Sequence, residues 1–201
     1  MNKKDRLDLL NQIEKEVVNL KKSPLYQERI NQNAFPVIGE GDYSAKIMFI
    51  GEAPGKNEAR TGKPFCGSAG KVLDELLESI ELKRENIYIT NIVKDRPPSN
   101  RDPSSEEISI YAPFLDRQID IIQPKIIVAL GRFSAQYILT KFGLENEIKP
   151  ITIIHGKVFV VKTSYGAIKI VPFFHPAAAI YDRKKRDILF EKIKVLKDVN
   201  L

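Results

Sequence analysis

The chain has 201 residues, of which 43% are hydrophobic, and this length is enough for one domain with a full core. Its single cysteine, Cys66, excludes an internal disulfide and any all-cysteine metal site within one chain. The formal net charge of +6 favours polyanions but does not prove that one is bound. No apolar stretch is long enough to cross a bilayer, and the N-terminus lacks the apolar centre of a secretory signal. We therefore expect residues 1–201 to form a single cytosolic domain that does not bind membranes.

Taken in chain order, the sequence predicts helices that alternate with strands. Apolar residues at helical spacing predict an amphipathic helix over residues 3–22. Residues 23–45 contain prolines and glycines and are interpreted as a long connection. Residues 47–50 (IMFI) then predict a buried strand, which ends abruptly in the turn 51–55 (GEAPG).

The middle of the chain repeats this alternation. A glycine cluster at 67–70 opens a helix predicted near 68–82. Residues 86–91 predict a second short buried strand, whereas 94–103 (KDRPPSNRDP) is too rich in proline and polar residues for regular structure. The acidic first turn after Ser104 predicts a helix that runs to roughly residue 122.

The C-terminal half adds further strands. Residues 125–130 (KIIVAL) give the clearest buried strand, and the helix 131–142 follows it. Interrupted β-type runs over 149–171 predict a hairpin, and residues 183–196 predict a basic helix. Strands that alternate with helices predict an α/β protein, a three-layer α/β/α sandwich whose mainly parallel sheet has about four strands.

Candidate functional residues follow three of the predicted strands. Gly51 and Glu52, Asn91 and His175 each come where an apolar run ends. Because the carboxyl ends of parallel strands meet at one edge of a sheet, we expect these residues to converge there on a ligand site. The nearby glycines let the backbone approach a ligand closely, and a helix start offers free N–H groups to an anion.

Three motifs at these positions resemble those of a known family. GEAPG, followed by GKPFCGSAG at 62–70, is similar to the first motif region of the family 4 uracil-DNA glycosylases, the iron-sulfur type of the wider superfamily. Residues 90–98 (TNIVKDRPP) and 174–177 (FHPA) agree with it. The resemblance implies a uracil-DNA glycosylase-like fold. It also implies a monofunctional enzyme that hydrolyses the N-glycosidic bond of uracil in DNA and leaves an abasic site for base excision repair. We expect a monomer that works on a flipped base at a prokaryotic nucleoid.

The resemblance also assigns roles within the pocket. Asn91 matches the asparagine that reads uracil, since one amide can accept from N3–H and donate to O4, whereas cytosine presents the reverse pattern. His175 matches the histidine of the HP motif, which donates to uracil O2 as negative charge builds on the base. Where other branches place a water-activating residue, this chain has Ala53, two residues after Gly51 in the base-binding loop. Glu52 either holds a weakly activated water or only shapes the loop.

Other expected contacts surround the base. Phe65 resembles the aromatic residue that stacks on the extruded base, with a core phenylalanine as the alternative. Glu58 corresponds to a residue near the C5 edge that would exclude the methyl group of thymine, or else is an exposed loop glutamate. The residues expected at the DNA backbone are Gly67, Ser68, Ala69, Pro97, Pro98, Ser99, Arg183 and Lys184. The basic residues 183–186 could equally form a solvated helix face. The residue that would wedge into the DNA duplex lies among 178–181.

The sequence departs from the family in its cysteines. Family 4 members resemble one another in holding an iron-sulfur cluster with four cysteines, whose positions here carry Leu20, Ser23, Asp95 and a residue near Tyr111. We therefore expect no cofactor and no metal, with side chains such as Leu20 and Tyr111 filling this place. Two other functions remain open, namely a glycosylase for another deaminated base such as hypoxanthine, or an inactive DNA-binding module.

Overall fold

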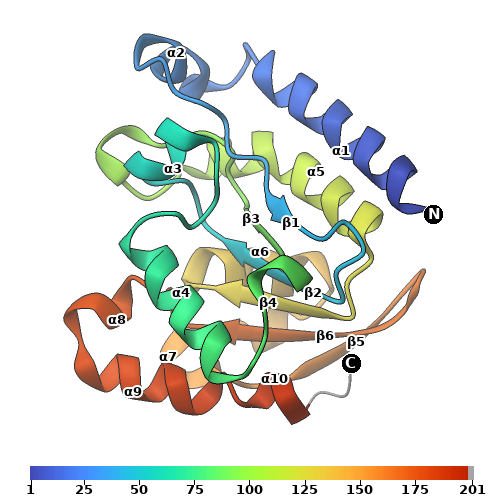
Figure 1. The fold of residues 1–201 in the computed structure, drawn as a ribbon, viewed down its shortest axis with the longest axis vertical. Helices are drawn as coiled ribbons and strands as arrows, with labels where there is room; N and C mark the ends of the chain where they lie inside the picture. Colours follow the sequence, from blue (N-terminus) through green and yellow to red (C-terminus); the bar gives the residue numbers. More distant parts are fainter. Residues whose placement is uncertain (199–201) are drawn as a thin grey trace.

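The computed structural model describes residues 1–198, which fold around one six-stranded sheet with the strand order β1-β3-β2-β4-β6-β5 (Figure 1). The four inner strands run parallel to one another and are β3 (Tyr88–Asn91), β2 (Ile47–Gly51), β4 (Ile126–Leu130) and β6 (Gly166–Phe173). Two antiparallel strands, β1 (Glu40–Gly41) and β5 (Phe159–Thr163), complete the edges. The sheet thus has six strands rather than about four, because these two edge strands join the parallel core.

Helices cover both faces of the sheet, which confirms the α/β/α sandwich. One face packs against α1 (Lys3–Val18), α5 (Ser105–Ile122) and α6 (Arg132–Lys141). The other face packs against α4 (Ser68–Ser79), α9 (Arg183–Lys192) and α10 (Val195–Asp198). Successive strand residues point to opposite faces, so Met48 and Ile50 join the first core, and Ile47 and Phe49 join the second. None of the helices in residues 1–198 is long and apolar enough to span a membrane.

Two helices lie where the sequence predicted connections. The N-terminal helix ends at Val18, and α2 (Pro24–Asn31) begins soon after it. The Ser23 side chain accepts a hydrogen bond from the N–H of Leu25, and Pro24 occupies the first turn, which is the usual chemistry of a helix start. A further short helix, α3 (Lys56–Thr61), lies inside the base-binding loop and ends at Gly62, whose φ of 74° is left-handed.

The remaining elements are short. They are η1 (Arg84–Asn86), η2 (Pro98–Asn100), η3 (Glu145–Glu147), α7 (Ile151–Ile154) and α8 (Ala178–Tyr181). The predicted hairpin starts only at Phe159, because the residues after Pro150 form α7 instead. The predicted basic helix is divided into α9 and α10 near Ile193.

The parallel strands end together at one edge of the sheet. Gly51 pairs with Asn91, and Leu130 pairs with Phe173, each at the last residue of its strand. The segments that follow β2, β3 and β6 therefore leave the sheet side by side, as the sequence predicted for Glu52, Asn91 and His175.

Candidate functional site

A cavity of about 370 Å³ lies at this edge of the sheet. The predicted residues that line it are Glu52, Ala53, Glu58, Phe65, Ala69, Asn91, Pro97 and His175. Its position at the carboxyl ends of parallel strands is the usual place for a ligand in an open α/β sheet. The structure thus brings together residues that are up to 123 positions apart, counted from Glu52 to His175.

Asn91 is the last residue of β3, and its side chain is buried. Its Oδ1 atom is buried without any hydrogen-bond partner. A buried acceptor left unpaired costs about 1–3 kcal/mol, and Asn91 lines the cavity, so this unpaired acceptor is a candidate partner for a ligand donor. The amide group can therefore accept one hydrogen bond and donate others to a molecule in the cavity.

Gly51, at the end of β2, forms the floor beneath this amide. A Cβ atom added to Gly51 would lie 2.2 Å from Asn91 Oδ1 and 2.8 Å from the Phe65 ring. Only glycine leaves room for both side chains. Gly51 therefore contributes to the site through the absence of a side chain.

His175 follows β6, and its ring is stacked on Phe65 with centroids 5.6 Å apart. The Nδ1 atom accepts a hydrogen bond from the N–H of Ala177 at 3.2 Å. Burial lowers the pKa of His175 to about 4, so the ring is neutral near pH 7 and carries its proton on Nε2. The histidine can therefore donate from Nε2 into the cavity.

Phe65 is held in an unusual backbone conformation, with a φ of 48°. The first turn of α4 packs closely against it, because a Cβ atom on Gly70 would lie 1.8 Å from the Phe65 carbonyl oxygen. Left-handed φ values are strained for aromatic residues and need support from their surroundings. Phe65 is 6% exposed, and it both belongs to the core on the α4 face of the sheet and lines the cavity.

Glu58 organises the loop that carries Phe65. Its Oε1 atom accepts hydrogen bonds from the N–H groups of Cys66 at 3.0 Å and of Gly67 at 2.9 Å. This carboxylate therefore ties α3 to the start of α4 while it also lines the cavity.

Glu52 lies at the cavity wall, half-buried. Burial, together with the negative charge of Asp102, raises the pKa of Glu52 to about 7, while Arg132 opposes this shift. A carboxyl group with such a pKa can gain or lose a proton near neutral pH, which suits a group that holds or activates water.

Several lining residues were missed by the sequence analysis, namely Pro54, Gly55, Asn100, Arg101 and Ala177. Arg101 is held by a bidentate ion pair with the buried carboxylate of Glu107, at 2.6 and 2.8 Å. Glu107 also closes the capping box at the start of α5 with Ser104. The Ser-x-x-Glu pattern was a visible signal for that helix start, but nothing in the sequence indicated its arginine partner.

The residues expected at the DNA backbone occupy two places. Pro98 and Ser99 form the short η2 turn beside the cavity, where the φ of Ser99 is 55°. Ser68 and Arg183 line a second hollow of about 470 Å³, with Lys71, Val72, Ala179, Ile180, Tyr181 and Arg186. Lys184 is exposed on α9 and does not line this hollow.

At the start of α4, the N–H group of Gly67 already has a partner within the protein. Its N–H group donates to Glu58 and is therefore not available to a phosphate. The N–H groups of Ser68 and Ala69 lie in the first turn of α4, where a helix leaves such groups without internal partners.

Comparison with known proteins identifies the family. Residues 38–198 match the model of the uracil DNA glycosylase superfamily. The chain belongs to that superfamily. The matched region contains the cavity and all three motifs that led to the resemblance.

Curated relatives agree with this membership. The chain is 48% identical to the Type-4 uracil-DNA glycosylase of Sulfurisphaera tokodaii over 96% of this chain and 86% of the relative. It is 42% identical to the protein of the same name from Archaeoglobus fulgidus, over 90% and 88%. It is also 37% identical to that of Thermotoga maritima, over 96% and 95%.

The residues at the family's expected cluster position do not fit an iron-sulfur cluster. The sequence contains one cysteine, and Cys66 is exposed in the base-binding loop. At three of the expected cysteine positions the structure has buried Leu20, Ser23 and Asp95, and Tyr111, near the fourth, is buried as well. The three polar side chains among them are bonded to one another rather than arranged as soft ligands around iron.

These polar side chains form one buried network with a nearby arginine. The Tyr111 hydroxyl donates to Asp95 Oδ2 at 2.5 Å, and Ser23 donates to the Tyr111 oxygen at 2.8 Å. Arg29 contacts both carboxylate oxygens of Asp95 at 3.1 Å and donates to the carbonyl of Val17 at the end of α1. Each polar group thus has a partner, and the network joins the N-terminal helices to the loop after β3 and to α5.

Proposed function

We propose that this chain removes uracil from DNA by hydrolysing the bond between the base and deoxyribose, leaving an abasic site. The observation that carries the proposal is the buried, unpaired Oδ1 of Asn91, a residue that lines the same cavity as Phe65 and His175. A flipped uracil presents an N3–H donor between two carbonyl acceptors, and this donor is the partner that Asn91 Oδ1 lacks.

The arrangement favours uracil over cytosine. If Oδ1 accepts from N3–H, the amide nitrogen of Asn91 faces O4 and donates to it. Cytosine has an acceptor at N3 and a donor at C4, so both contacts would become repulsive. Phe65 would stack on the base, a contact worth about 1–3 kcal/mol.

His175 would assist departure of the base. When the bond between N1 and C1′ breaks, its electron pair goes to the uracil ring, and negative charge develops on O2. A neutral imidazole that donates from Nε2 stabilises this charge without requiring an extra proton. Water then adds its oxygen to C1′ of the cationic sugar, and Glu52 is placed to hold that water or to accept its proton.

The remaining surface would hold the DNA strand. Ser68 and Arg183 line the second hollow, and Asn100 of the η2 turn lines the cavity. The net charge of +6 favours a polyanion. We propose that residues 1–201 act as one monomeric domain on an extruded base, in the prokaryotic compartment that holds the genome. Among residues 1–198, no specific contact favours a purine substrate or an inactive binding module.

The proposal is tested with end-labelled oligonucleotides that carry uracil or hypoxanthine, in single strands or opposite guanine. After incubation with the protein in EDTA, alkali cleaves any abasic site. Wild type should release uracil, while Asn91→Ala and His175→Ala should each slow release by about 10²–10³-fold, as the loss of one stabilising donor or acceptor does.

Three other outcomes would overturn the proposal in different ways. Cleavage only at hypoxanthine would change the substrate and keep the chemistry. Tight binding of DNA without cleavage would indicate an inactive module. Uracil release that survives both substitutions would show that the cavity described here is not the active site.

A further inference from the structure

Lys94 is a fully buried lysine that is hydrogen-bonded to the backbone of Asn91, a residue that lines the cavity. It lies three residues after Asn91, and its Nζ atom donates to the backbone carbonyl of Asn91 at 2.6 Å. It also contacts Thr90 Oγ1 at 2.8 Å and Gln118 Oε1 at 2.5 Å. The lysine therefore joins the end of β3 to α5 at the residue proposed to read the base.

All three partners of Lys94 present acceptor lone pairs. The single hydroxyl hydrogen of Thr90 is directed to the carbonyl of Ile38, at 2.6 Å. The amide nitrogen of Gln118 donates to Ile38 and to the Tyr88 hydroxyl, which turns its Oε1 atom towards Lys94. Three acceptors need three N–H donors, and only the charged ammonium form has three. The hydrogen bonding therefore favours a cation at this position.

A cation here is costly to the fold. Burial shifts the pKa of Lys94 well below the ordinary lysine value, and no carboxylate among the described residues opposes the shift. Buried charges are normally paired, because an unpaired one loses its hydration without compensation. A charge that is retained beside a cavity without a counter-ion is typical of a functional site.

We propose that Lys94 is a positioning residue that fixes the backbone of Asn91 and places a positive charge behind the base, where it stabilises the uracil anion as it leaves. This inference rests on the proposed function. The ammonium acts through Asn91 and does not touch the base. Its charge still acts at this range because the surrounding protein and the stacked base exclude water, which leaves the local field poorly screened.

The test compares two leaving groups. Uracil and 5-fluorouracil have the same hydrogen-bonding edge, but fluorine withdraws electrons and makes the departing anion more stable. Single-turnover release of each base is measured for wild type and for Lys94→Met. We expect Lys94→Met to slow release of uracil by about ten- to hundredfold and release of 5-fluorouracil clearly less, because a better leaving group depends less on an external charge.

Thr90→Val is the matched control. It removes one of the three acceptors but keeps the ammonium, so it should change the rates for both bases by the same small factor. If Lys94→Met does not fold at the assay temperature, Lys94→Gln is used instead, because its amide can still donate to Asn91 but carries no charge.

The outcomes separate this inference from the proposed function. If wild type does not release uracil, the proposed function itself fails. If wild type releases uracil and the uncharged variants are as fast, Lys94 has no role in the reaction. An equal loss with both bases would show that Lys94 only supports packing, and would overturn the electrostatic role.

Discussion

The pKa of Glu52 is raised and the pKa of His175 is lowered from their ordinary values. Together the two shifts predict how the rate of uracil release depends on pH. His175 stays neutral from pH 8 down to its pKa of about 4. Glu52 loses its proton only near pH 7. If Glu52 accepts a proton from water, release of uracil should fall as pH decreases from 8 to 6, and Glu52→Gln should abolish that dependence.

The control for this pH profile is Asp102→Asn. It removes the nearby negative charge that raises the Glu52 pKa, so the inflection should move to lower pH. A wild-type profile that is flat between pH 6 and 8 would leave Glu52 with the loop-shaping role alone.

The raised pKa of Glu52 also predicts that the stability of the protein depends on pH. A raised carboxyl pKa means that the folded state binds the proton more tightly than the unfolded chain between pH 4.5 and about 7. The free energy of unfolding therefore decreases as pH rises through that window. Glu52→Gln avoids this loss, so its melting temperature should exceed that of wild type at pH 8 and should equal or fall below it at pH 4. Scanning calorimetry at both pH values measures the difference, and a gain that is equal at both would rule out ionisation as its cause.

The structure leaves no room for a side chain at position 51. Gly51→Ala would place a methyl group 2.2 Å from Asn91 Oδ1, so the amide would have to move away from the base. We expect a loss of activity of about 10²-fold or more, similar to the loss of an oriented stabilising group. Gly143→Ala, where a new Cβ atom meets nothing within 4 Å, is the control: it strains only its own backbone and should leave the rate unchanged in single-turnover assays.

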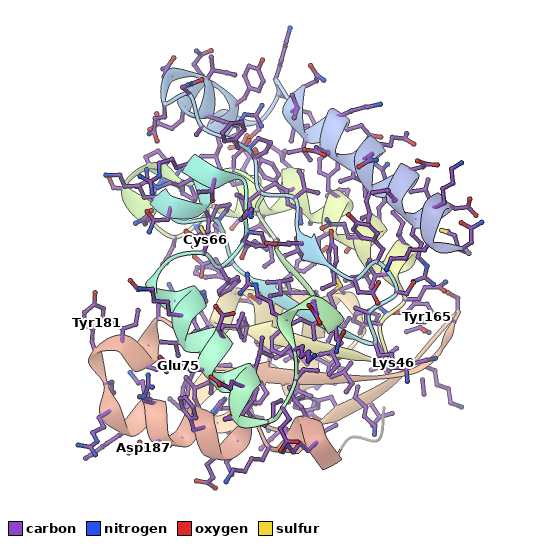
Figure 2. All side chains as sticks on the ribbon, viewed as in Figure 1. Lys46, Cys66, Glu75, Tyr165, Tyr181 and Asp187 are labelled. Carbon is purple, nitrogen blue, oxygen red and sulfur yellow. The ribbon has the colours of Figure 1, made fainter. Side chains whose placement is uncertain are left out.

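At the scale of elements, α8 presents an exposed aromatic side chain beside the site. Tyr181 is 91% exposed, whereas Ala179 of the same helix is buried, and Figure 2 shows Tyr181 at the outer edge of the molecule. An exposed aromatic residue is suited to fill the space that a flipped base leaves in a duplex. Tyr181→Ala should therefore slow uracil release from double strands more than from single strands.

Val160→Ala provides the comparison for this helix. Val160 is also strongly exposed, but it lies on the edge strand β5 and does not line either cavity. Its loss should affect both substrates equally little. If Tyr181→Ala reduces both rates by one factor, α8 contributes to binding of the strand and does not act as the wedge.

The sequence predicted the elements whose signals are local. Strands such as 47–50 and 125–130 are continuous apolar runs, and their parallel pairing brings Glu52, Asn91 and His175 to one edge. The sequence analysis missed α2 and α3, because short helices inside loops have weak periodicity. It also missed Arg101, Lys94 and Arg29, whose partners depend on contacts between distant segments; Arg29 and Asp95 are 66 positions apart. Buried polar networks of this kind follow from the packing of elements and leave little trace in sequence spacing.

At the scale of the whole molecule, the Arg29 and Asp95 ion pair fastens the N-terminal helices to the catalytic half. Asp95 is 1% exposed, so Asp95→Asn would leave the Arg29 charge buried and unpaired. We expect a loss of about 3–5 kcal/mol in the free energy of unfolding, measured by denaturant titration. Glu16→Gln breaks the partly exposed pair between α1 and α5 at Arg117 and should cost less than about 1 kcal/mol.

Metal analysis of the purified protein tests the same region. Because Leu20, Ser23, Asp95 and Tyr111 offer no thiolate, the protein should be colourless and should contain no stoichiometric iron. Brown colour with stoichiometric iron would contradict the polar network described here.

The tight floor of the pocket also restricts how this protein could evolve a new substrate. Gly51, the Asn91 amide and the Phe65 ring are packed so closely that any side chain at Gly51 would displace the amide or the ring. The rim is more permissive at Ala53, which lines the cavity outside this floor, whereas Glu58 holds the loop that carries Phe65. Adaptation to a larger or differently substituted base would therefore proceed by rim substitutions, with the floor inherited unchanged.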